Sequence, residues 1–119
     1  FVAPGTVVIP EAEGGDDPNA DIFVDARDRA RAAGLLVLPM PSVGRFERDG
    51  AIVPASYMNF VIANGQAIVP VYGVASDREA VKALARALPG HRVSGLPSGA
   101  ILTGGGSFHC ITQQQPERP

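Results

Sequence analysis

The pair Asn64-Gly65 constrains the fold of this chain more than any other sequence feature. It separates two runs rich in β-branched, aromatic and other apolar residues, at positions 57–63 and 66–71. Asn-Gly between two such runs is the strongest short-range signal for a β-hairpin, because both residues tolerate a positive φ angle. The sequence therefore predicts two antiparallel strands joined by a two-residue turn.

A helix is predicted directly after this hairpin, over residues 77–88. Ser76 precedes it and Glu79 follows three residues later, which is the pattern of a capping box. Apolar residues then recur at helical spacing, which indicates one face that packs inward. We expect that face to consist of Val81, Leu84, Ala85 and Leu88.

A Pro-Gly pair ends the predicted helix, and residues 91–96 are predicted to form a third strand. The order of this segment is therefore strand, strand, helix, strand. A weaker copy of the same unit lies upstream, with a strand over residues 6–9, a helix over 20–33 and a strand over 35–39. Two related ββαβ-like units predict a repeated α/β architecture.

The boundaries of the upstream elements rest on single residues. Pro10 stops the first strand, Asn19 is a candidate N-cap, and Gly34 takes the position where left-handed residues end helices.

The continuous apolar run over residues 35–39 predicts a strand buried on both faces. The acidic loop over residues 11–19 is expected to face solvent. The predicted inward stripe of the helix is Ile22, Ala26, Ala30 and Ala33.

Length and composition limit the chain to one domain, residues 1–119, with units at about 1–54 and 55–119. Hydrophobic residues make up 45% of it, but no run is long enough to cross a membrane. The net charge of −2 and the scattered basic residues argue against nucleic acid as a partner. One cysteine fits a reducing cytoplasm. Because the chain begins with Phe1 and not Met, we expect a fragment or a processed piece.

Cys110 cannot form an internal disulfide, so its thiol serves either packing or reactivity, and spacing alone favours packing. The glycines before it predict a tight turn, or a place where a flat ligand approaches the backbone closely. Residues 107–111 then predict a short strand that carries Cys110. Neighbouring strand residues point to opposite faces, so His109 is predicted to be structural and not the catalytic base. Together with His91, these residues lack zinc-ligand spacing, so no metal is expected.

Three segments of the chain closely resemble agmatine deiminases, in the family that also contains bacterial-type peptidylarginine deiminases. They are GGGSFHCITQQQP at 104–116, ASYMNFVIANG at 55–65 and FVAPGTVV at the start of the chain. The resemblance covers essentially the whole chain. It implies the pentein α/β propeller, in which five ββαβ units surround a central site, with about two of the five units present here.

The resemblance also implies a site. Cys110 matches the nucleophile that attacks the guanidinium carbon of agmatine, and Gly104 and Gly105 match the stretch whose backbone carbonyl faces the guanidinium. Asn59 is expected among the substrate-binding residues, where it orders the central channel and does not act chemically. No cofactor is implied. The implied product is N-carbamoylputrescine, in putrescine synthesis.

The base and the guanidinium-clamping carboxylates of such enzymes match no segment of this chain. The resemblance places the base in a His-x-Asp segment just upstream of the FVAPGT-like run, so the remainder of the same catalytic domain is the expected partner. A peptidylarginine deiminase and an inactive fragment or non-catalytic paralogue are the alternatives. A homo-oligomer is left open by the sequence.

Overall fold

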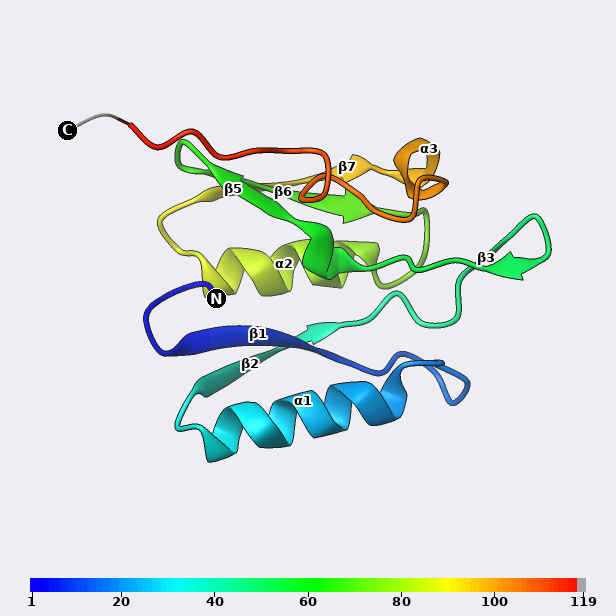
Figure 1. Cartoon of the computed structure of the whole chain (residues 1–119), viewed down its shortest axis with the longest axis horizontal. Helices are drawn as coiled ribbons and strands as arrows, with labels where there is room; N and C mark the ends of the chain where they lie inside the picture. Colours follow the sequence, from blue (N-terminus) through cyan, green and yellow to red (C-terminus); the bar gives the residue numbers. More distant parts are fainter. Residues whose placement is uncertain (118–119) are drawn as a thin grey trace.

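The computed structural model describes residues 1–117, and it begins with a parallel β-α-β unit (Figure 1). Strand β1 (Thr6–Glu11) pairs with β2 (Leu36–Pro41), and helix α1 (Ala20–Ala32) makes the crossover between them. Gly34 ends α1 with φ +79°, as predicted. Strand β1 continues past Pro10, contrary to expectation, because β2 is its only neighbour among the described strands and the missing N–H breaks no second ladder.

The second unit has the predicted order of strand, strand, helix, strand. Strands β5 (Val61–Ala63) and β6 (Gln66–Val71) are antiparallel, β7 (Arg92–Pro97) is parallel to β6, and α2 (Asp77–Ala87) connects β6 to β7. Asn64 and Gly65 have φ angles of 51° and 74°, so the predicted hairpin turn is confirmed. The start of the run 57–63 is not a strand but the 3-10 helix η1 (Tyr57–Asn59), where the Ser56 hydroxyl accepts the Met58 N–H.

Asn19 and Ser76 take the predicted N-cap positions, but neither side chain makes the predicted cap hydrogen bond. The Ser76 hydroxyl lies 2.9 Å from the Tyr57 hydroxyl and does not cap α2. Asp77 instead accepts the backbone N–H groups of the turn before the helix, those of Tyr72, Gly73 and Val74. At α1 the Asn19 side chain makes no cap, and Asp17 accepts the Asn19 N–H at 2.9 Å.

Helix α2 lies between the β1–β2 sheet and the β5–β6–β7 sheet and contributes several residues to the hydrophobic core (Figure 1). It packs on β7 and β6 of its own unit and on β2 of the other. Its buried face is shifted from the predicted one, because Ala85 is exposed and Ala80 and Ala83 are buried with Leu84 and Leu88. Gly95 of β7 allows the close approach, since an added Cβ would lie 2.9 Å from Val71 and 3.0 Å from Val81.

Helix α1 has no buried residue, although it was predicted to turn a stripe inward. Ile22 is 63% exposed and Ala33 is exposed, and only Ala26 and Ala30 of that stripe are half-buried against the β1–β2 sheet. Strand β2 is also not buried on both faces, since Leu36 is 60% exposed. The β1–β2 sheet has only two strands, so each strand has one neighbour among the described strands, and α1 packs on this sheet alone.

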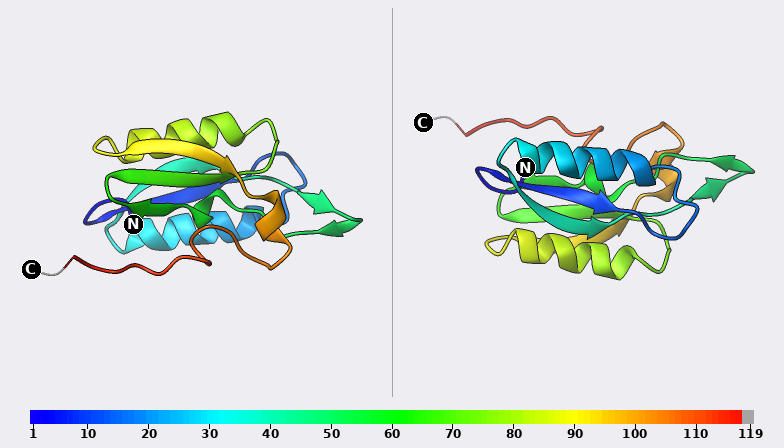
Figure 2. Two further views of the ribbon diagram at one scale, coloured as in Figure 1. Left: turned by 90° about the horizontal axis from the view of Figure 1, so that it is seen from above. Right: turned by 90° about the horizontal axis from the view of Figure 1, so that it is seen from below.

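A short hairpin and a short helix were not predicted. Strands β3 (Glu47–Arg48) and β4 (Ala51–Ile52) form a hairpin that extends beyond the rest of the chain (Figure 2). Helix α3 (Gly99–Leu102) precedes the glycine triplet, and Arg48 of the hairpin donates to the carbonyl of Gly99. Within residues 1–117, the structure holds no helix long and apolar enough to cross a bilayer.

Candidate active site

Cys110 lies in a turn and not on the predicted strand. The N–H groups of Cys110 and Ile111 both donate to the carbonyl of Ser107, at 3.0 and 3.3 Å. Consecutive amides that bond back to one carbonyl give a local turn and leave no strand ladder. His109 and Cys110 therefore do not alternate between the two faces of a sheet, contrary to expectation. The Cys110 side chain is free of disulfides and exposed.

Asn59 and Cys110 meet although they are 51 residues apart. The Cys110 Sγ donates to Oδ1 of Asn59 at 2.9 Å. The backbone carbonyl of Asn59 also accepts the His109 N–H at 3.1 Å. Asn59 ends the η1 turn just before β5, so the position of η1 against the sheet sets where this side chain lies. Two of the sequence-predicted site residues are thus brought together by the fold.

The three glycines before Cys110 have different positions. Gly104 and Gly105 continue the turn after α3, and their N–H groups donate to the carbonyls of Ile101 and Leu102 at 3.0 and 2.9 Å. Gly105 has φ +84° and open space around it. Their predicted role toward a guanidinium stays a prediction.

Gly106 is the glycine that touches the thiol, and the sequence reasoning missed it. An added Cβ would lie 2.8 Å from the Cys110 Cβ and 2.9 Å from its Sγ, closer than real Cβ atoms approach. Only a glycine therefore leaves room for the thiol in this position. Its place in the same triplet was the available signal, but the spacing did not show which glycine contacts the cysteine.

Two buried serine hydroxyl groups anchor the Cys110 turn. Ser107 and Ser98 are both completely buried, and their Oγ atoms lie 2.5 Å apart. Ser98 also caps the start of α3 through backbone bonds, so the contact ties the Cys110 turn to α3. A buried hydroxyl pair of this kind is stabilised because one hydroxyl donates a hydrogen bond to the other. The exposed thiol therefore sits on an anchored backbone.

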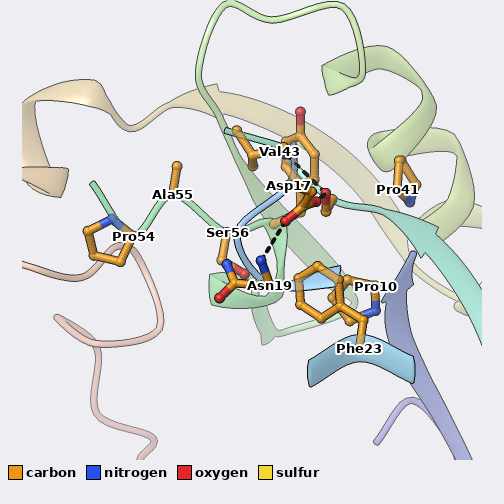
Figure 3. Close-up of a pocket in the computed structure, with 12 residues that line it drawn as sticks. Pro10, Asp17, Asn19, Phe23, Pro41, Val43, Pro54, Ala55 and Ser56 are labelled. Carbon is orange, nitrogen blue, oxygen red and sulfur yellow. Dashed lines mark hydrogen bonds between the residues drawn. The ribbon is translucent and has the colours of Figure 1, made fainter. Parts of the chain in front are cut away.

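A separate cavity of about 240 Å³ lies beside the ends of β1 and β2 (Figure 3). Asp17 lines it and is only 7% exposed, so the prediction that the whole acidic loop faces solvent is wrong. The carboxylate accepts the N–H groups of Glu13 and Asn19 and the hydroxyl of Ser42. Burial alone would raise the pKa of Asp17, but these hydrogen bonds outweigh it and hold the pKa below its ordinary value. Asp17 therefore stabilises the loop over residues 11–19 by hydrogen bonds.

The segment after Cys110 runs along β5 (Figure 1). Residues 112–116 and 61–64 line a groove of about 500 Å³ between them.

Residues 1–117 contain no group of three or more His, Cys, Asp and Glu side chains that could hold a metal ion.

The sequence pattern of the family described as Porphyromonas-type peptidyl-arginine deiminase matches residues 1–116. The chain belongs to this family. It is 34% identical to the agmatine deiminase of Pseudomonas putida and 36% identical to that of Pseudomonas aeruginosa. Each alignment covers 98% of this chain and 38% of the relative, so the chain spans about two fifths of the length of these curated members.

Solved structures of the family have the same fold. The agmatine deiminase of Enterococcus faecalis superimposes with a TM-score of 0.90 and 32% identity, over 100% of this chain and 39% of that one. The C. jejuni agmatine deiminase gives 0.85 and 27%, over 92% of this chain and 35% of that one. These matches confirm the predicted α/β class, built from pentein ββαβ units, and the resemblance to agmatine deiminases. The unit boundary near residue 54 stays a prediction.

Proposed function

We propose that this chain is the C-terminal part of a catalytic domain that hydrolyses the guanidino group of agmatine, with Cys110 as the nucleophile. The observation that carries the proposal is the placement of one exposed thiol against Gly106 and Asn59. It occurs in a chain that matches agmatine deiminases over nearly its whole length.

In the proposed reaction the Cys110 Sγ forms a bond to the guanidinium carbon, and the bond from that carbon to one terminal nitrogen breaks. The thiol proton leaves with this nitrogen, so ammonia departs and a thiouronium-type cation remains on sulfur. Water then adds to the same carbon, the carbon–sulfur bond breaks, and sulfur regains a proton. The released proton is taken up by ammonia, which gives N-carbamoylputrescine and ammonium. A covalent route of this kind divides one difficult step into two easier ones.

The chain supplies the nucleophile and needs further groups. A guanidinium presents a planar fork of donors, which carboxylates bind well, and proton transfer needs a base within hydrogen-bond reach. We expect these groups in the remainder of the same domain, because the relatives are more than twice as long. The 119-residue chain alone is therefore expected to be inactive, and ureido product formed from agmatine by that purified chain would contradict this.

Peptidyl-arginine is the second candidate substrate, because the family is described by that activity. The relatives with 34–36% identity carry the name agmatine deiminase, which favours the small amine. An assay of the complete protein with agmatine and with arginine-containing peptides separates the two. A cytoplasmic location and a place in putrescine synthesis stay predictions.

The test of the nucleophile is Cys110→Ala in the complete protein. We expect it to abolish the ureido product and any substrate-derived mass adduct on the peptide that carries residue 110. Ile52→Ala, a change at an exposed site in β4, is the matched control and should keep full activity. Turnover that survives in Cys110→Ala would remove the thiol from the reaction. If the complete wild-type protein shows no turnover of agmatine, the result would favour the non-catalytic paralogue.

A further inference from the structure

Asn59 holds the Cys110 turn by two separate contacts. Its backbone carbonyl accepts the His109 N–H at 3.1 Å, and its side-chain Oδ1 accepts the thiol of Cys110 at 2.9 Å. The first contact survives any substitution of the side chain. The second depends on the amide alone. The two contributions of Asn59 can therefore be separated by experiment.

A carboxamide suits both states of a reacting sulfur. Its oxygen accepts a hydrogen bond from a neutral thiol, and its NH₂ group donates to a thiolate. The two ends are nearly equal in shape, so a half-turn of the amide exchanges acceptor for donor at the same place. A carboxylate of the same shape offers only acceptors.

We propose that Asn59 is a positioning residue for the nucleophile: its amide accepts the Cys110 S–H in the resting state and donates to the sulfur once the proton has left. This inference rests on the proposed function. It differs from the expected role of Asn59 toward substrate, because the structure directs the amide to the sulfur.

The rest of the turn is held without this amide. Ser107 and Ser98 anchor it from below through their buried hydroxyl contact, and the Cys110 N–H bonds to the Ser107 carbonyl. Asn59 itself is half-buried and Cys110 is exposed. A change in the amide should therefore alter the sulfur and leave the backbone in place.

The test uses Asn59→Asp in the complete protein, because aspartate keeps the shape and removes the donors. We expect the rate of alkylation of Cys110 by iodoacetamide near neutral pH, followed by peptide mass mapping, to fall at least about tenfold. We expect kcat on agmatine to fall by at least about tenfold, with KM changed less than about twofold, as for a lost hydrogen bond to a charged group. Asn59→Ala should lower kcat to a similar extent without adding charge.

Asn64→Asp is the matched control. Asn64 is exposed in the hairpin turn five residues away, and Asp-Gly supports the same turn type. It should keep both the alkylation rate and kcat.

Wild-type alkylation and kcat in both Asn59 variants would overturn the proposal, and so would a loss in Asn59→Asp that Asn64→Asp shares. A loss of kcat in Asn59→Ala that is matched by a rise in KM would return Asn59 to a substrate-binding role and also overturn it. The proposed function fails by a different result, activity of Cys110→Ala.

Discussion

Helices α1 and α2 hold the same place in their two units but have different surroundings. Helix α2 is covered on one side by β6 and β7 and on the other by β2, and it buries Ala80, Ala83 and Leu84. Helix α1 has one sheet beside it and buries none of its residues. The comparison shows that the hydrophobic core forms where a helix has a sheet on each side, and that an amphipathic pattern alone does not bury a helix.

The largest expected effect separates the two helices directly. Leu84→Ala in α2 removes a fully buried side chain, so we expect a loss of about 2–5 kcal/mol in the free energy of unfolding. Ile22→Ala in α1, at a side chain that is 63% exposed, should change it by less than about 0.5 kcal/mol. Urea denaturation of both variants of the complete protein measures the difference. Equal losses would show that α1 is covered as α2 is.

The next effect concerns Asp77, whose carboxylate accepts hydrogen bonds from the turn before α2. Asp77→Ala leaves the N–H groups of Tyr72, Gly73 and Val74 without their acceptor. We expect a loss of about 2–3 kcal/mol, because these are hydrogen bonds to a charged group in a partly buried turn. Arg78→Ala, at the next position and exposed, is the control. An unfolding midpoint of Asp77→Ala equal to that of the control would contradict the role of Asp77 in stabilising this turn.

Asp17 in the first unit gives a smaller, pH-dependent effect. Its pKa in the folded chain is lowered from 3.8, because the hydrogen bonds from Ser42, Asn19 and Glu13 outweigh burial. Its contribution to stability is therefore complete above the ordinary pKa and is lost as pH falls through the lowered one. Thermal melts of the wild type and Asp17→Asn should differ most near neutral pH and converge on acidification. Asp16→Asn, an exposed neighbour, should show no such convergence. A difference in melting temperature between the wild type and Asp17→Asn that stays constant with pH would contradict the expected direction of this effect.

The smallest effect on stability is expected at Gly106. Its substitution should disturb the Cys110 thiol and little else. Gly106→Ala pushes a Cβ into the Cys110 side chain, which is exposed and has room to move, so we expect the unfolding midpoint to stay nearly unchanged. Activity of the complete protein should fall about 10- to 100-fold, as a misplaced reacting group requires. Gly90→Ala, with open space around it and no positive φ, should keep full activity. Full activity of Gly106→Ala would show that the thiol does not need this approach.

Much of the second unit could be predicted because its features are local. The Asn64-Gly65 turn and helix α2 follow from positive φ angles and helical spacing, which act between near neighbours. The first unit was predicted less well: the order of its elements was right, but the burial of β2 and α1 was wrong. Burial depends on which layers cover an element. The 13 residues of α1 do not contain that information in their own pattern.

The candidate site shows the same division. The sequence by itself determined that one thiol follows a glycine turn, and the family resemblance marked it as a nucleophile. Only the tertiary structure brought Asn59 to Cys110, chose Gly106 among three glycines, and replaced the predicted strand at Cys110 with a turn. The physical reason is that a hydrogen bond between residues 51 positions apart depends on how η1, the sheet and α3 pack, whereas turns and helices depend on neighbouring residues.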